Sequence, residues 1–289
     1  MNSLAILLLV SFLGGAENDA RQIEVSHLAR SLQPGEVVLI TVESQLPLKQ
    51  MEGKAFEKTF LFYPTTEDTV WQGLIGIDLE TTAGNYPVLM NGTTSDGVSV
   101  QHSYELQVEH KEFPTRRLTV DEKFVNPPQE MMSRIRRESR RVSEAFAGLN
   151  PDKLWDHSFL SPVPGATTSG FGKRSILNGQ PRSPHTGTDF DAAEGTPVKA
   201  PNRGKVVLVS NLYYSGNTVI LDHGQGLYSY FGHLSRFAVE EGQMISPGDR
   251  VGDVGATGRV TGAHLHWTVR LNGTRVDPLS LMDALSGLD

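Results

Sequence analysis

The chain has 289 residues, enough for two ordinary domains, and its 38% hydrophobic and 20% charged residues are typical of a soluble globular protein. Its 26 basic and 33 acidic residues give a net charge of −7, which argues against nucleic acid as the main partner because no basic excess is left to neutralise phosphates. The absence of cysteine excludes a thiol nucleophile, a cysteine-ligated metal, a disulfide framework and a lipidated-cysteine anchor.

The N-terminus carries a compact apolar run over residues 4–13, followed by Gly14, Gly15 and Ala16. The run is much shorter than the roughly 20 residues of a membrane span. It predicts a signal peptide over residues 1–16, export to the periplasm, cell envelope or medium, and no transmembrane helix in the mature chain. Because no Lys or Arg precedes the run, a buried N-terminal strand is the alternative.

Residues 17–118 contain short runs rich in β-branched and aromatic residues, separated by turn signals such as Pro34-Gly35 and Asn91-Gly92. The expected strands are 37–42, 56–63, 71–79, 86–90 and 98–108. This pattern predicts an immunoglobulin-like β-sandwich without a cluster of titratable groups that would suggest chemistry.

A helix is expected in a linker over residues 119–150. Asn126 is the predicted cap, with Pro127 and Pro128 in the first turn, and Gly148 can end the helix. One apolar stripe contains residues 131, 135, 142 and 146. The other faces are rich in arginine, which indicates a solvated surface or contact with an anionic polymer or membrane.

Residues 151–289 are dense in Gly and Pro and predict a second, antiparallel all-β domain. Its expected strands are 196–200, 204–210, 217–222, 228–232 and 264–271.

Six of the nine histidines lie in this second half: His157, His185, His223, His233, His264 and His266. On a strand, His264 and His266 share one face, as do His185 and Asp189, with Gly187 between them leaving room for an ion. His185, Asp189 and His266 together match a catalytic zinc site with an open fourth position. His233 and His264 remain as imidazoles for proton transfer. From spacing alone, a purely structural role for these residues is as well supported as a metal site.

Several spaced motifs then occur in order. They are S-G-F-G-K-R at 169–174, H-T-G-T-D at 185–189, G-T-P-V at 195–198, L-D-H-G-Q-G at 221–226, G-H-L-S at 232–235, and G-A-T-G at 255–258 running to G-A-H-L-H at 262–266. Over about residues 160–282 this set resembles the LytM/lysostaphin-type M23 metallopeptidases, the zinc endopeptidases of bacterial peptidoglycan. The N-terminal part more loosely resembles the β-domain found ahead of some M23 peptidases.

The resemblance implies an M23-type β domain with zinc on His185, Asp189 and His266, and His233 and His264 as the catalytic pair. It implies cleavage of peptide cross-links in peptidoglycan. The alternatives are a non-catalytic wall-binding or amidase-regulating protein on the same fold, and a peptidase of protein substrates. The N-terminal domain could position the enzyme, bind substrate, or cover the cleft.

Two positions depart from the family pattern. Phe231 stands where many relatives have Tyr, and Tyr230 is expected on the opposite strand face. Arg259 stands where relatives commonly have Ser, on a loop beside the expected cleft, and could alter substrate preference. His223 is expected to be structural.

Overall fold

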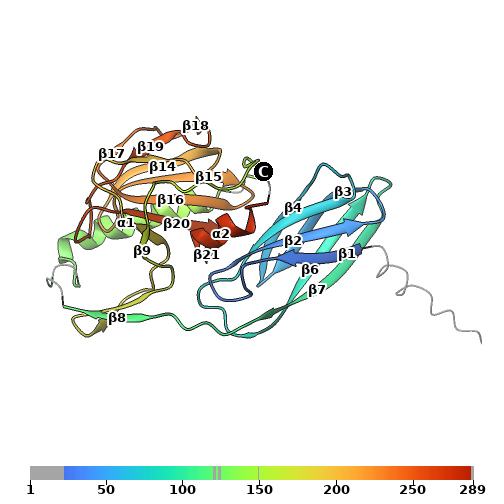
Figure 1. Ribbon diagram of the computed structural model, residues 1–289, viewed down its shortest axis with the longest axis horizontal. Coiled ribbons are helices and arrows are strands. Elements are labelled where there is room, and N and C mark those ends of the chain that lie inside the picture. Colours follow the sequence, from blue (N-terminus) through green and yellow to red (C-terminus); the bar gives the residue numbers. More distant parts are fainter. Residues whose placement is uncertain (1–22, 120–121, 123–124, 149, 288–289) are drawn as a thin grey trace, which may run out of the picture.

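The computed structural model describes residues 23–119, 122, 125–148 and 150–287, which form two β-rich domains and two helices (Figure 1). This confirms the all-β, two-domain prediction. The predicted signal peptide lies outside the described residues. In the described part of the chain, no helix has the length and apolar character needed to cross a membrane.

The N-terminal domain is one curled seven-stranded sheet in the order β1-β2-β5-β4-β3-β6-β7. All seven strands contribute side chains to a single core, so the domain is barrel-like, with one continuous hydrogen-bonded path instead of two separate sheets. The predicted strand at 56 begins later, because Phe56 and Glu57 form a hairpin turn with φ of 49° and 61°. The strands are β1 Ile23–Leu28, β2 Val37–Ser44, β3 Leu48–Ala55, β4 Lys58–Pro64, β5 Val70–Gly76, β6 Gly84–Thr94 and β7 Ser99–Val108.

The segment that follows β7 packs on the second domain. Strand β8 (Thr115–Leu118), at the end of the predicted N-terminal domain, pairs in parallel with β10 (Arg174–Leu177), and β10 also pairs with β11 (Gln180–Pro181). Helix α1 (Met132–Phe146) lays Val142 and Phe146 against Leu208, Ile220 and Tyr228. The predicted boundaries of the two domains and the linker stay predictions.

The predicted start of the helix is wrong. A 3-10 turn (Gln129–Met131) follows Pro128, and α1 begins at Met132 without a side-chain cap. The physical reason is the Pro127-Pro128 pair, since a residue before proline is pushed out of the helical region and Pro128 itself has an extended ψ of 145°. On the arginine-rich face, Arg134 and Arg141 bond to Asn211, Ser210 and Glu241 of the second domain.

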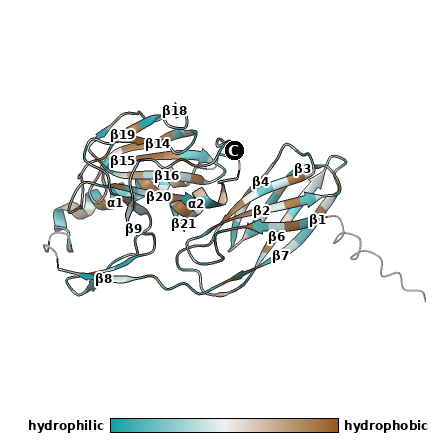
Figure 2. Cartoon of the chain, in the orientation of Figure 1, coloured by the Kyte–Doolittle hydropathy of each residue, from teal (hydrophilic) through white to brown (hydrophobic). Residues whose placement is uncertain are grey.

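The second domain is built on a large antiparallel sheet in the order β18-β14-β15-β16-β20-β12-β9, with β21 beside β20. A small sheet, β13-β19-β17, packs beside it. Hydrophobic colouring follows the central strands β14 and β15 (Figure 2). The strands are β9 Thr167–Ser169, β12 Thr188–Phe190, β13 Pro197–Lys199, β14 Gly204–Leu212, β15 Gly216–Gly224, β16 Leu227–Leu234, β17 Arg236–Phe237, β18 Met244–Ile245, β19 Arg250–Asp253, β20 Leu265–Leu271 and β21 Thr274–Val276.

The hydrophobic core of the second domain extends across the junction into the first domain, which also has a separate core of its own. Val37 and Tyr63 of the first domain join the same cluster of buried side chains as Trp155 and Val276 of the second. The rings of Tyr63 and Trp155 meet edge to face at 5.9 Å. Helix α2 (Pro278–Ala284) lies at this junction, where the Ser280 hydroxyl accepts a hydrogen bond from the Val37 amide at 2.8 Å.

Charged side chains reinforce the junction. Arg30 contacts Glu36 of its own domain at 2.9 Å and Asp277, the cap of α2, at 2.7 Å. Asp277 also accepts a hydrogen bond at 3.3 Å from Thr188 on β12. The N-terminal domain is thereby connected to the strand that carries Asp189.

Candidate metal centre

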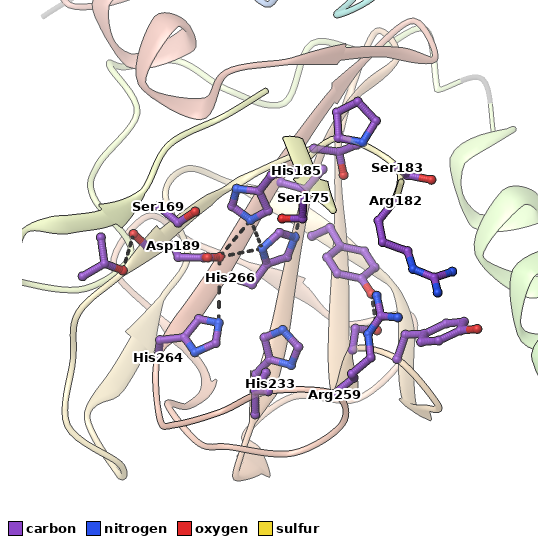
Figure 3. Close-up of a pocket in the computed structure, with 18 of the residues that line it drawn as sticks. Ser169, Ser175, Arg182, Ser183, His185, Asp189, His233, Arg259, His264 and His266 are labelled. Atoms are coloured by element: carbon purple, nitrogen blue, oxygen red, sulfur yellow. Dashed lines mark hydrogen bonds and ion pairs between the residues drawn. The ribbon is translucent and has the colours of Figure 1, made fainter. Parts of the chain in front are cut away.

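Three predicted ligands meet on one face of the large sheet. Asp189 on β12 lies directly opposite His266 on β20, so both side chains leave the sheet on the same side. Asp189 Oδ1 is 3.0 Å from His185 Nε2 and 2.8 Å from His266 Nδ1, and the two ring nitrogens are 3.1 Å apart. Figure 3 shows the three side chains pointing toward one another. These ligand atoms could hold one metal ion.

His185 reaches this point from a loop, which corrects the expectation that it shares a strand face with Asp189. Strand β12 begins only at Thr188. Gly187 does not leave room for an ion; it leaves room for strand β20. A Cβ on Gly187 would stand 2.4 Å from the Trp267 carbonyl oxygen and 2.9 Å from the His266 ring.

Backbone carbonyls orient three of the four imidazoles at the site. His185 Nδ1 lies 3.1 Å from the Gly170 oxygen, His233 Nδ1 2.9 Å from the Thr257 oxygen, and His264 Nδ1 2.9 Å from the Gly262 oxygen. A carbonyl oxygen only accepts, so each Nδ1 carries a proton, and in the neutral form of each ring Nε2 is the atom with the lone pair. His266 uses its other edge, because its Nε2 lies 2.9 Å from the Thr268 hydroxyl and its Nδ1 faces Asp189.

The donor set fits a small divalent cation. Asp189 supplies a carboxylate oxygen to the cluster, and His185 and His266 each supply a ring nitrogen. Among the described residues, no Lys or Arg forms an ion pair with this carboxylate. Ligand atoms bound at 2.0–2.1 Å around a tetrahedral ion stand about 3.3 Å apart, close to the separations seen here. Two ring nitrogens and one carboxylate oxygen thus converge at ligand distances, and this set with a single negative charge suits a divalent cation.

The other two predicted residues lie beside this triad. His264 Nε2 is 3.8 Å from Asp189 Oδ1, and its ring centroid is 4.9 Å from that of His233. Burial lowers the pKa of His233 to about 3, so the His233 ring is neutral at pH 7. The structure thus brings together all five residues singled out from the sequence.

Tyr230 also lies at the site, which corrects the expectation that it points away. Tyr230 pairs with Thr268 across β16 and β20, and its ring meets His266 edge to face at 6.3 Å. Phe231 is fully buried on the other face. Strand alternation fails at His233, where φ is +64°. The rule that residues two apart share a strand face therefore pointed to Phe231, whereas the side chain at the site is that of Tyr230.

The five residues line a cleft of about 810 Å³. The segment that follows β7 supplies part of its wall, through Arg116 of β8 and Val142 and Phe146 of α1. No described residue of strands β1–β7 lines the cleft. In this structure, that domain docks at α2 and does not cover the site.

His223 lies outside the site, as expected. It is fully buried, with Nδ1 2.7 Å from the Arg203 carbonyl oxygen and Nε2 2.9 Å from the Ser229 hydroxyl. Both ring nitrogens therefore have protein partners, which is typical of a structural histidine.

Comparisons with known proteins agree with this geometry. Residues 183–278 match Peptidase family M23. A crystal structure of a putative peptidase M23 from Pseudomonas aeruginosa is 32% identical, with a TM-score of 0.69 and coverage of 89% of this chain and 97% of that chain. Peptidoglycan DD-endopeptidase ShyA of Vibrio cholerae is 43% identical over 97 residues, which are 34% of this chain and 23% of ShyA.

DD-carboxypeptidase/endopeptidase Mpg of Neisseria meningitidis (strain MC58) is 41% identical over 97 residues, which are 34% of this chain and 22% of that protein. The matched segment thus spans less than a quarter of either curated relative, whereas the Pseudomonas structure is matched over both domains. The chain belongs to Peptidase family M23.

Proposed function

We propose that this chain is an exported, zinc-dependent endopeptidase that hydrolyses peptide cross-links of bacterial peptidoglycan. The observation that carries the proposal is the convergence of His185 Nε2, Asp189 Oδ1 and His266 Nδ1 beside two further imidazoles in an open cleft. The names of the curated relatives, peptidoglycan DD-endopeptidase and DD-carboxypeptidase/endopeptidase, support peptidoglycan as the substrate.

His185, Asp189 and His266 would hold the zinc ion. The chemistry that zinc supplies in such a site is a lower pKa for a coordinated water, about 7, and polarisation of a carbonyl group. Two neutral imidazoles and one carboxylate are the ligands expected of a catalytic zinc site, which leaves a coordination position for water or substrate.

We assign His264 as the general base. Its Nδ1 proton is held by the Gly262 carbonyl, so its Nε2 lone pair faces the ligand cluster, 3.8 Å from Asp189 Oδ1. His264 then accepts the proton of the attacking water and delivers it to the leaving amine. His233, fixed by Thr257 and packed against the His264 ring, orients that ring and borders the reacting carbonyl.

The test is digestion of intact sacculi by the purified full chain, with released products identified by mass. We expect release of cross-link cleavage products that stops with a chelator and returns with zinc. His264→Ala is the matched variant, because it should keep one zinc per chain yet lose about 10²–10⁴-fold in rate. Stoichiometric zinc without chelator-sensitive cleavage would contradict the peptidase assignment. Absence of stoichiometric zinc would favour the non-catalytic regulator.

A further inference from the structure

Strand β20 carries an arginine on the same face as the metal ligand His266. His266, Thr268 and Arg270 alternate with the buried apolar residues of this strand, and all three line the cleft. Four residues of a strand span about 13 Å, so Arg270 stands well away from the metal centre in the same cleft. A group bound by Arg270 would therefore belong to a part of the substrate remote from the bond that is cut.

The Arg270 guanidinium has no counter-charge bonded to it. Within the part of the chain that the structure describes, no carboxylate or carbonyl oxygen accepts a hydrogen bond from it or forms an ion pair with it, and its Nε is buried without a partner. Burying a charge is costly unless the charge is paired, so proteins seldom leave a partly buried guanidinium in this state. The N–H donors of Arg270 are thus left for a ligand.

The carboxylate whose charge acts on Arg270 is that of Asp78, and Asp78 is already bonded to another arginine. Its Oδ2 accepts from the Arg275 backbone amide at 3.0 Å and from Arg275 Nε at 3.1 Å, and its Oδ1 accepts from Arg275 Nη2. Arg275 pairs with Arg270 across β21 and β20, so both side chains leave the sheet on the same side. Burial, and then the charge on Arg275, lower the pKa of Arg270 to about 10, which still leaves Arg270 charged at pH 7.

An aromatic ring orients Arg270 without using its donors. Arg270 Cζ lies 5.8 Å from the centre of the Phe146 ring of α1. That ring meets Tyr228 edge to face at 5.5 Å, and the Tyr228 hydroxyl donates to the Gly148 carbonyl at the end of α1. A contact with a ring holds a guanidinium in place and leaves its N–H groups available for hydrogen bonds.

We propose that Arg270 is an anion-binding subsite of the cleft, which binds a carboxylate that the substrate carries several residues away from the scissile bond. A guanidinium fork donates paired hydrogen bonds to a carboxylate, and a bound carboxylate supplies the counter-charge that Arg270 lacks. This inference rests on the proposed peptidase function and adds a substrate class to it: peptides with a free carboxylate remote from the bond that is cut.

The test uses a cross-linked peptide purified from sacculi and the same peptide with its carboxylates converted to carboxamides. We would measure kcat/KM for the wild type, and Kd for both peptides with the His264→Ala chain. We expect the carboxylate form to be preferred about tenfold in each measurement, the size expected of one charge-assisted hydrogen-bonded contact.

Arg270→Met removes the charge and keeps an extended side chain. It should bring the preference close to unity, mainly through KM, and its ligand-free melting temperature should equal or exceed that of the wild type because an unpaired, partly buried charge is gone. Arg270→Lys should keep only part of the preference because the fork is lost. Arg140→Gln, on the exposed face of α1, is the matched control for loss of one positive charge and should keep the full preference.

A wild type that binds both peptides equally would overturn the subsite, as would a preference that survives in Arg270→Met. A lower melting temperature of Arg270→Met would also count against it, because Arg270 would then stabilise the fold without a ligand. An equal loss of preference in Arg140→Gln would reduce the effect to net charge and overturn the subsite. If the wild type cleaves neither peptide, the peptidase proposal fails, and the Kd measurements still decide whether the subsite exists.

Discussion

Gly187→Ala tests whether close packing between the His185 loop and β20 sets the geometry of the metal centre. The new Cβ would stand 2.4 Å from the Trp267 carbonyl oxygen and 2.6 Å from the Thr268 hydroxyl, below the 3.0 Å that real Cβ atoms observe. The loop must therefore move outward by roughly half an ångström, whereas metal–ligand distances tolerate about 0.2 Å. We expect a loss of about 1–3 kcal/mol in the free energy of unfolding, the usual cost of overpacking.

Because His185 moves with this loop, zinc affinity should also fall about ten- to hundredfold, as it does when the support of a ligand is disturbed. Metal titration and thermal unfolding of the metal-free chain measure the two effects separately. Gly232→Ala is the matched control. Gly232 pairs with His266 from β16, the neighbour of β20 on the edge away from β12, and a Cβ there would stand 3.5 Å or more from its nearest neighbours. Gly187→Ala with unchanged zinc affinity would refute the reasoning.

Three further predictions concern the ligands and the domain junction. His185→Ala should fold but bind zinc far more weakly, which metal analysis after dialysis will show. The paired carboxyl of Glu36 has a lowered pKa, so its stabilising effect is complete above its ordinary pKa of 4.5 and is lost as pH falls. The Glu36→Gln variant should therefore melt at a lower temperature than the wild type at pH 7, and its melting temperature should fall less than that of the wild type between pH 7 and pH 3. Equal melting temperatures at pH 7 would show that these ion pairs do not stabilise the junction. A fragment that starts at Pro151 should be less stable and no more active than the full chain, because Trp155 and Val276 lose apolar cover from the first domain; a stable, more active fragment would show that the N-terminal domain inhibits.

The convergence of the candidate ligands was expected from short spaced motifs together with their resemblance to a known family, because spacing alone left a structural role equally open. His264 stands just before β20 and His266 is the second residue of that strand, and alternation along a strand predicted that the two rings lie on one face. The central strands of the second domain were predicted because each is a buried run of β-branched and aromatic residues.

Other features depended on contacts that no local pattern contains. The positive φ of His233 reversed the side-chain alternation and hid the position of Tyr230 at the site. Strand β3 was missed because Lys49, Gln50 and Glu52 break up its apolar positions. The pairing of β8 with β10 joins segments about 60 residues apart, so it reflects tertiary structure and not propensity.

The shared core at the domain junction has a consequence for how the enzyme meets its substrate. With Arg30, Asp277 and Thr188 connected in series, the first domain is fixed to the strand that carries Asp189. If the first domain binds to a surface, the distance and orientation of the cleft relative to that surface are then fixed by the junction. For the proposed peptidase, this fixed geometry would limit cleavage to substrate strands that lie at the distance between that surface and the cleft.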